Sequence, residues 1–199
     1  MRIHAYLAHR QSGFYPLAQI IEAAEKTNFS HVALGFEESD GSVTVYEALL
    51  PVGTHKIGFG DWIVQNNFSV AKEYIWEVPD DLGGQCRNLA EQMLGSGYSY
   101  LQLVLSYVVQ FAGFVRHLVS GKHATGYICT EYCYDVLKPL MDRANLKLAV
   151  DPALLSLTQM RIIFDEIPLN LPGVTGASTT KLSAAARPVR STLGARRGR

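Results

Sequence analysis

The chain has 199 residues, of which 48% are hydrophobic and 18% charged, and its formal net charge is zero. This composition is that of one globular domain and excludes a fibrous or wholly disordered chain. Its three cysteines are odd in number and exclude a complete disulfide framework, so free thiols in a reducing compartment are expected. The start of the chain lacks an apolar run of signal-peptide length, which predicts a cytoplasmic protein or one carried in a virion.

Hydrophobic periodicity and turn signals predict a mixture of strands and helices, which is typical of an α+β domain. In chain order we predict a strand at 1–9, a helix at 16–27, strands at 29–37 and 43–50, a glycine-rich connection at 51–62, a strand at 70–79, and helices at 80–94, 101–119, 129–144 and 151–163. Asp40 and Gly41 form a turn signal, so the strands on either side should pair as an antiparallel hairpin. Pro139 is expected to bend or end its helix.

The charges are unevenly distributed along the chain. All 18 acidic residues precede Leu171, whereas the segment 171–199 carries six basic residues and none that is acidic. We therefore predict a folded domain over 1–170 and a basic, low-complexity extension over 171–199. Because no aromatic residues interleave with these basic residues, a protein assembly is the expected partner of the extension, and nucleic acid is the less favoured alternative.

The segment from Gln92 to Val115 contains no charged residue and raises the question of a membrane span. A spanning helix needs roughly 20 mostly apolar residues. The strongly apolar part of this segment is shorter, and Gln102, Ser106 and Gln110 recur in it at helical spacing as a polar stripe. We therefore predict a buried amphipathic helix and no transmembrane span.

Alternation along the two hairpin strands places Glu47 on the same face as Val43, Val45 and Leu49. A carboxylate on an apolar face is costly unless it is paired. His31, on the neighbouring strand, shares its face with small residues and is a suitable partner. The alternative, in which Glu47 lies at a strand end and reaches water, fits the pattern equally well.

Cys129 falls where a loop gives way to a predicted helix, and Cys133 follows one turn later. A helix N-terminus stabilises a thiolate through its unpaired N–H groups and its dipole. The pattern therefore fits either a nucleophile at Cys129 or a buried free thiol, whereas Cys133 should face the core. No Cys/His pairs have zinc-ligand spacing and no glycine-rich phosphate loop is present, so no metal or cofactor is expected.

Four short motifs occur in a fixed order: SHVALGF, VYEALLPVG followed by GDW, GSGYSY, and YICTEYCYDVL. Together they resemble the circularly permuted papain-like cysteine hydrolases of the NlpC type, especially the YiiX-like branch related to lecithin–retinol acyltransferase. The resemblance spans about residues 1–165, and Thr130 stands where the family has serine. The order of His31 before Cys129 is the mark of the permuted branch. The resemblance implies an antiparallel sheet packed against a helix that begins at Cys129.

The resemblance also implies roles for individual residues. Cys129 corresponds to the nucleophile, His31 to the base that takes its proton, and Glu47 to the polar residue that orients His31. The backbone N–H of Cys129 would donate to the oxyanion, Tyr98 would line the substrate site, and Glu131 would be structural. The remaining histidines match no motif and are expected to be surface or satisfied core residues: His4, His9, His55, His117 and His123.

The implied function is a thiol hydrolase that forms an acyl-enzyme on Cys129 and acts on a peptide or acyl substrate. An amidase or endopeptidase acting on cell-wall peptides is the expected form, with a phage particle as the hypothesised carrier in the absence of an export signal. Two alternatives stay open. One is a structural virion or assembly component that keeps the fold with little or no activity. The other is a lipid acyl hydrolase or acyltransferase, with which the apolar helix predicted at 101–119 is compatible.

Overall fold

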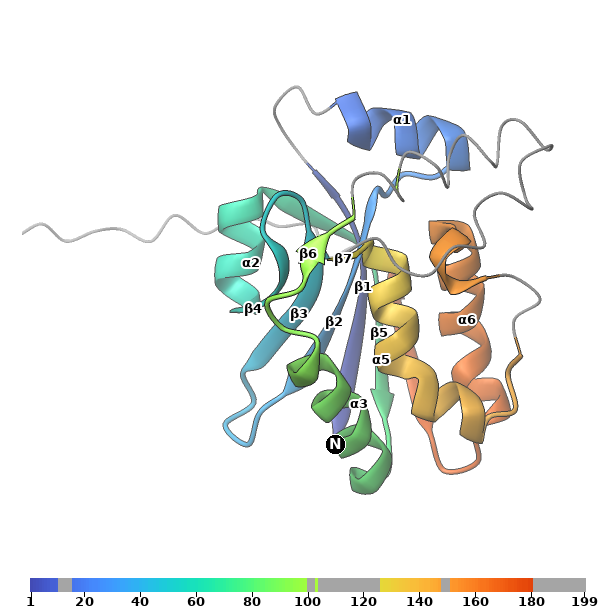
Figure 1. Ribbon diagram of the computed structural model, residues 1–199. Coiled ribbons are helices and arrows are strands. Elements are labelled where there is room, and N and C mark those ends of the chain that lie inside the picture. Colours follow the sequence, from blue (N-terminus) through green and yellow to red (C-terminus); the bar gives the residue numbers. More distant parts are fainter. Residues whose placement is uncertain (11–15, 100–102, 104–125, 148–150, 181–199) are drawn as a thin grey trace, which may run out of the picture.

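A six-stranded antiparallel sheet forms the centre of the protein, in the order β4-β3-β2-β1-β5-β8 (Figure 1). The computed structural model describes residues 1–10, 16–99, 103, 126–147 and 151–180. The strands of this sheet are β1 Arg2–Arg10, β2 His31–Glu37, β3 Val43–Leu49, β4 Gly53–Gly58, β5 Phe68–Glu77 and β8 Thr175–Thr180. A separate parallel pair consists of β6 Gly97–Tyr98 and β7 Gly126–Tyr127.

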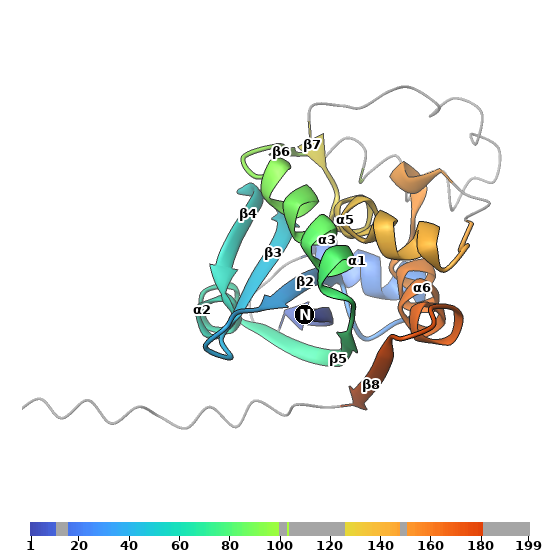
Figure 2. The same cartoon turned by 90° about the horizontal axis from the view of Figure 1, so that it is seen from below.

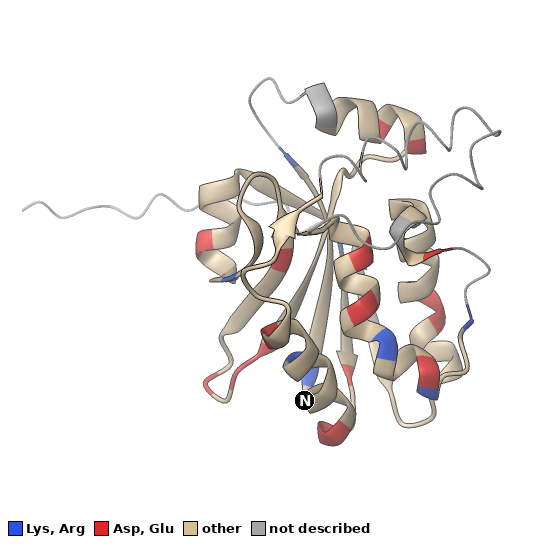
Figure 3. Ribbon diagram, viewed as in Figure 1, with Lys and Arg blue, Asp and Glu red and all other residues tan. Residues whose placement is uncertain are grey.

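Helices cover both faces of the sheet. Those in the described part of the chain are α1 Pro16–Glu25, α2 Phe59–Asn66, α3 Asp80–Gln92, α5 Cys129–Arg143 and α6 Leu157–Asn170, with a short 3₁₀ turn at Pro152–Leu154. The view from below shows α3, α5 and α6 on one face and α2 on the other (Figure 2). Charged residues are visible on α3, α5 and α6 and on the β2–β3 turn (Figure 3). The predicted α+β class is confirmed.

Side chains alternate between the two faces of the sheet along β1, so this strand contributes residues to two hydrophobic clusters. Ile3, Ala5 and Leu7 belong to the larger cluster, which α3, α5 and α6 complete. Tyr6 faces the other way and belongs to a smaller cluster with Trp62 of α2. The sheet therefore has a buried layer on each face. Trp62 and Phe68 of the smaller layer contact Glu47 and His31, whereas Cys129 belongs to the larger layer.

Helix α5 packs on the sheet through residues at helical spacing. Cys133, Val136, Leu137 and Leu140 follow the i, i+3, i+4, i+7 pattern of an amphipathic helix, and all four are buried. The helix continues through Pro139 to Arg143, so Pro139 does not end it. This packing fixes the first residue of α5 against the β2–β3 side of the sheet, because α5 contacts both strands.

The segment 51–62 was expected to be a glycine-rich connection, and that expectation is wrong. It contains β4, which pairs with β3 in register from Thr44 to Leu49, and the start of α2. Glycine content weakens both strand and helix propensity, which explains why local pattern failed here. The strand forms because β3 offers it an edge to pair with.

The C-terminal part of the sheet continues past the boundary expected at residue 170. Strand β8 pairs with β5 over its whole length, and Leu171 and Val174, which lead into it, are buried in the larger cluster. The helix predicted at 151–163 runs instead from Leu157 to Asn170. It begins with a capping box in which Ser156 and Gln159 satisfy each other's backbone N–H groups.

The predicted helix at 101–119 lies outside the described residues apart from Leu103, which is buried. Within the part of the chain that the structure describes, no helix has the length and apolarity needed to cross a bilayer.

Candidate active site

His31 stands at the first position of β2 and is almost completely buried. Its ring stacks on Phe68 with a centroid distance of 5.0 Å and an interplanar angle of 5°. On the neighbouring strand its backbone partner is Ala8, whose small side chain leaves room for the ring. Stacking and burial together hold the imidazole in one orientation.

Glu47 lies in the middle of the site and is fully buried. Its Oε2 accepts a hydrogen bond from His31 Nε2 at 2.6 Å and another from Trp62 Nε1 at 2.8 Å. Its Oε1 lies 3.2 Å from His55 Nε2. The pairing of Glu47 with a histidine on the neighbouring strand, one of the two alternatives left by the sequence pattern, is the arrangement that the fold adopts.

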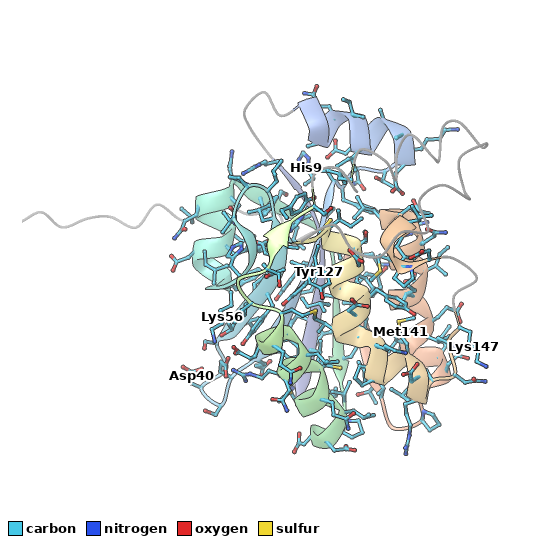
Figure 4. All side chains as sticks on the ribbon, in the orientation of Figure 1. His9, Asp40, Lys56, Tyr127, Met141 and Lys147 are labelled. Carbon is cyan, nitrogen blue, oxygen red and sulfur yellow. The ribbon has the colours of Figure 1, made fainter. Side chains whose placement is uncertain are left out.

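Cys129 is the first residue of α5 and is buried. Just before it, β7 pairs with β6 so closely that a Cβ on Gly126 would lie 2.3 Å from the carbonyl oxygen of Gly97. Figure 4 places the labelled Tyr127 beside the start of this helix. The N-cap residue of α5 is Ile128, whose side chain makes no capping hydrogen bond.

Electrostatic interactions link Cys129, His31 and Glu47. Burial alone would lower the pKa of His31, but its interactions with Cys129 and Glu47 outweigh burial and raise the pKa to about 10. Burial alone would raise the pKa of Glu47, but the hydrogen bonds from His31 and Trp62 and the nearby His55 outweigh burial and lower the pKa to about 2. Because Nε2 of His31 is held by Glu47, Nδ1 is the nitrogen left for the thiol of Cys129.

The sequence also singled out Tyr98, Cys133 and Glu131 around the nucleophile, and the structure describes all three. Burial and an interaction with Cys129 raise the pKa of Tyr98 well above its usual value, and Tyr98 lines a pocket together with His31. Cys133 is fully buried, and burial raises its pKa well above that of an ordinary thiol. Glu131 is buried on the first turn of α5. The structure thus brings Tyr98 to the site, while Cys133 lies in the core as predicted.

Three contacts of this site were not predicted from the sequence. His55 was assigned to the surface or core, yet it contacts Glu47 directly, and Trp62 and Phe68 were given no role. His55 is the cross-strand partner of Glu47 in the β3–β4 register. Recognising β4 as a strand would have placed them side by side, whereas no local signal points to the aromatic contacts.

The other histidines divide into two groups. His4 is buried and its Nδ1 lies 2.9 Å from Glu73 Oε1, and His9 forms an ion pair with Glu22 at 3.4 Å. The first pair links β1 to β5 and the second links β1 to α1. Both pairs therefore hold neighbouring elements together and are not part of the interactions among Cys129, His31 and Glu47. His117 and His123 lie outside the described residues.

A comparison with solved structures finds a protein with a similar fold. The metalloprotein YiiX from Escherichia coli O157:H7, assigned to DUF1105, superposes with a TM-score of 0.52 and 12% sequence identity over 90% of this chain and 96% of that chain. The chain shares the fold of YiiX. No family model and no curated protein matches the sequence. At this identity the likeness concerns the fold alone.

Proposed function

We propose that this protein is a thiol hydrolase with a permuted papain-like arrangement, in which Cys129 is the nucleophile, His31 the acid–base group and Glu47 the residue that orients His31. The observation that carries the proposal is the position of His31, which interacts with Cys129 at the start of α5 and is hydrogen-bonded through Nε2 to a fully buried Glu47. A nucleophile bonded to a base, which is itself held by a third polar group, is the geometry of nucleophilic catalysis.

In this proposal His31 takes the proton of the Cys129 thiol, which forms a thiolate–imidazolium pair. The raised pKa of His31 fits a cation held between Glu47 and Cys129. The Cys129 sulfur attacks the substrate carbonyl carbon and forms a C–S bond, while the negative charge moves to the carbonyl oxygen. The N-terminal amides of α5, where the N-cap residue Ile128 supplies no capping side chain, are the donors to that oxyanion in this proposal.

Collapse of this intermediate needs a proton for the leaving group. Nδ1–H of His31 donates it, the bond to the leaving alcohol or amine breaks, and a thioester remains on Cys129. Neutral His31 then takes a proton from water as the water attacks the thioester. Breakage of the C–S bond releases the carboxylic acid and restores the thiolate–imidazolium pair. Glu47 keeps its contact with Nε2 throughout and thereby holds the ring for both transfers.

YiiX is described as a metalloprotein, so the fit of a metal to this site needs a test. In the described ranges no group of three or more His, Cys, Asp or Glu side chains is placed to share a metal ion. Nε2 of His31 and Oε2 of Glu47 are already bonded to each other, and Oε2 also accepts from Trp62. These side chains do not fit a metal centre, and the proposed mechanism has no step that uses one.

Labelling and hydrolysis test the proposal together. Iodoacetamide at neutral pH should alkylate Cys129 and spare Cys86 and Cys133, since burial raises the pKa of both other thiols. Wild-type protein should hydrolyse p-nitrophenyl acetate, and Cys129→Ala should lose roughly 10³-fold or more of that rate. Mass spectrometry should detect an acetyl group on Cys129. Equal rates for wild type and Cys129→Ala would overturn the proposal and favour a structural component that keeps the fold.

Digestion of purified peptidoglycan addresses the cell-wall hypothesis made from the sequence. Product masses from wild type and Cys129→Ala should differ if the leaving group is a cell-wall amide. A virion carrier is a separate hypothesis, which copurification of the protein with particles would test.

A further inference from the structure

His55 lies on β4 directly opposite Glu47 in the β3–β4 register, so the two side chains lie on the same face of the sheet. Its Nε2 lies 3.2 Å from Glu47 Oε1, and its Nδ1 lies 3.3 Å from the carbonyl oxygen of Gly53. Both ring nitrogens therefore face acceptors, which holds the ring in one orientation. The described residues that line the pocket shared by Tyr98 and His31 do not include His55, which reaches the site through Glu47.

The backbone that carries His55 is held on both sides. On one side β4 pairs with β3, and on the other it is bonded to the segment that leads into β6. The N–H of Thr54 donates to the carbonyl oxygen of Ser96 at 2.8 Å, and the N–H of Gly95 donates to that of Thr54 at 2.9 Å. The hydroxyl of Thr54 also accepts from the N–H of Ser96 at 2.8 Å. The position of the His55 ring is therefore fixed by the fold around the site.

The contacts of Glu47 are divided unequally between its two oxygens. Oε2 accepts from His31 Nε2 at 2.6 Å and from Trp62 Nε1 at 2.8 Å, whereas among the described residues His55 is the one that faces Oε1. The last torsion angle of a glutamate side chain is broad, so contacts to one oxygen alone leave the plane of the carboxylate poorly defined. The contact at Oε1 fixes that plane. Because Oε2 holds Nε2 of His31, the plane also determines where the other ring nitrogen, Nδ1, points.

The charges favour the same arrangement. Contact with Glu47 raises the pKa of His55, which favours the cationic ring that donates to a carboxylate. Although burial opposes it, the pKa of Glu47 is lowered to about 2 by His31, His55 and Trp62 together. Glu47 is therefore ionised at neutral pH, and an ionised carboxylate accepts at both oxygens. It can thus hold one histidine at each oxygen.

We propose that His55 is a positioning residue of this site. By engaging Oε1 it holds the carboxylate of Glu47 in the plane that directs Oε2 to His31, and it thereby aims Nδ1 of His31 at the sulfur of Cys129. This inference rests on the thiol-hydrolase function and adds a fourth side chain to the three that carry it. Since His55 acts through Glu47, its effect is on the rate of the chemical steps and not on substrate binding.

Replacement of His55 tests the inference in the hydrolysis of p-nitrophenyl acetate. His55→Leu should lower kcat and kcat/KM alike by about 10- to 100-fold, with KM unchanged, because a misplaced base slows the chemical steps. His55→Gln keeps an N–H donor for Oε1 and should regain most of that loss. His9→Leu is the matched control, since His9 also pairs with a glutamate, Glu22, at 3.4 Å, and it should leave kcat unchanged. Alkylation of the buried Cys86 and Cys133 reports any unfolded fraction, so that unfolding is not mistaken for slower chemistry.

A measurement on His31 itself separates failure of the positioning from failure of the hydrolase. The Nε2–H proton of His31, which Glu47 accepts at 2.6 Å, should give a low-field proton NMR signal that is identified by its loss in His31→Gln. The signal should broaden or shift in His55→Leu and return in His55→Gln. An unchanged signal together with the wild-type kcat in folded His55→Leu would overturn the inference and leave the hydrolase intact. A signal that depends on His55, in a protein whose hydrolysis does not depend on Cys129, would support the positioning and overturn the hydrolase.

Discussion

His55 Nε2 lies 3.2 Å from Glu47 Oε1, the carboxylate oxygen that neither His31 nor Trp62 reaches. In the described part of the chain this oxygen has no hydrogen-bond partner. The nearby His55 is therefore the group that offsets the cost of burying its negative charge. His55 Nδ1 lies 3.3 Å from the carbonyl oxygen of Gly53, so both ring nitrogens face acceptors. The imidazolium form, which donates from both nitrogens, is therefore favoured. Contact with Glu47 accordingly raises the pKa of His55.

His55→Leu should destabilise the folded protein, because it leaves a fully buried carboxylate oxygen without a compensating group. The expected loss is about 1–3 kcal/mol of unfolding free energy, toward the lower end because solvent screens a side chain that is 23% exposed. His55→Gln retains an N–H donor of similar reach and should lose less. Urea denaturation of the three proteins measures the differences, and equal stabilities would show that the contact contributes nothing.

The stability gap between wild type and His55→Leu should also depend on pH. The folded-state pKa of His55 is raised above its ordinary value of 6.5. Its charge therefore contributes stability that is complete below pH 6.5 and is lost as the pH rises through the folded-state pKa. Denaturation in mildly acidic and in alkaline buffer should show the gap shrinking with rising pH. A gap that stays constant would mean that His55 is neutral in the folded state.

Glu47→Gln should move the alkaline limit of activity to lower pH. The charge of Glu47 and its hydrogen bond help to raise the pKa of His31 to about 10, so the protonated His31 needed for leaving-group departure persists to that pH. Without the carboxylate, this pKa should fall toward 6.5, and kcat should fall about 10²-fold because the ring is less well held. The pH profile of p-nitrophenyl ester hydrolysis measures both effects.

Glu91→Gln is a suitable control for that experiment. Glu91 also accepts from a tyrosine and pairs with Lys56, but it lies on α3 away from His31. Its replacement should leave the alkaline limit in place. An alkaline limit that does not move in Glu47→Gln would contradict the assigned role of Glu47.

Local rules made the pairing of His31 with Glu47 one of two equal alternatives, and the family resemblance favoured it. Both residues lie on strands joined by a short turn, and side-chain parity on a strand survives errors of one or two residues at its ends. The burial cost of a carboxylate then demands a partner. Cys129 was placed correctly at a helix start by the same local reasoning.

The contacts that complete the site depend on tertiary pairing and were not predicted. β4 carries His55 and α2 carries Trp62, yet the glycines of this segment made it look like a connection. The edge of β3 and the smaller hydrophobic cluster supply the stabilisation that local propensity lacks. Phe68 lies on β5 and His31 on β2, and both strands pair with β1. Their ring contact therefore depends on the order of the strands in the sheet.

Gly53→Ala should destabilise the protein and disturb the approach of β6 to the site. Gly53 has a φ of +85°, and a Cβ there would lie 2.3 Å from the carbonyl oxygen of Ser96. That oxygen already accepts from the backbone N–H of Thr54, so the backbone has little freedom to retreat. A loss of about 2 kcal/mol or more of unfolding free energy is expected from the clash and the unfavourable φ.

Gly60→Ala supplies the opposite result with the same chemical change. Gly60 lies in α2, and no atom of the described residues comes within 4 Å of a Cβ built on it. Alanine there should stabilise the helix by about 0.5–1 kcal/mol. Thermal denaturation of both variants measures the contrast, and destabilisation by both to the same extent would argue against the close packing at Ser96.

Two truncations should locate the end of the folded domain. Removal of residues 181–199 takes away only the end of the basic extension and should leave the thermal midpoint nearly unchanged. Removal of residues 171–199 also takes β8 from the edge of β5, together with Leu171 and Val174, which are buried in the larger cluster. Burial of two such side chains is worth about 3 kcal/mol or more, so this truncation should lower the midpoint by several degrees. Equal midpoints for the two truncated proteins would support the boundary at 170 that the sequence suggested and would show that β8 adds no stability to the sheet.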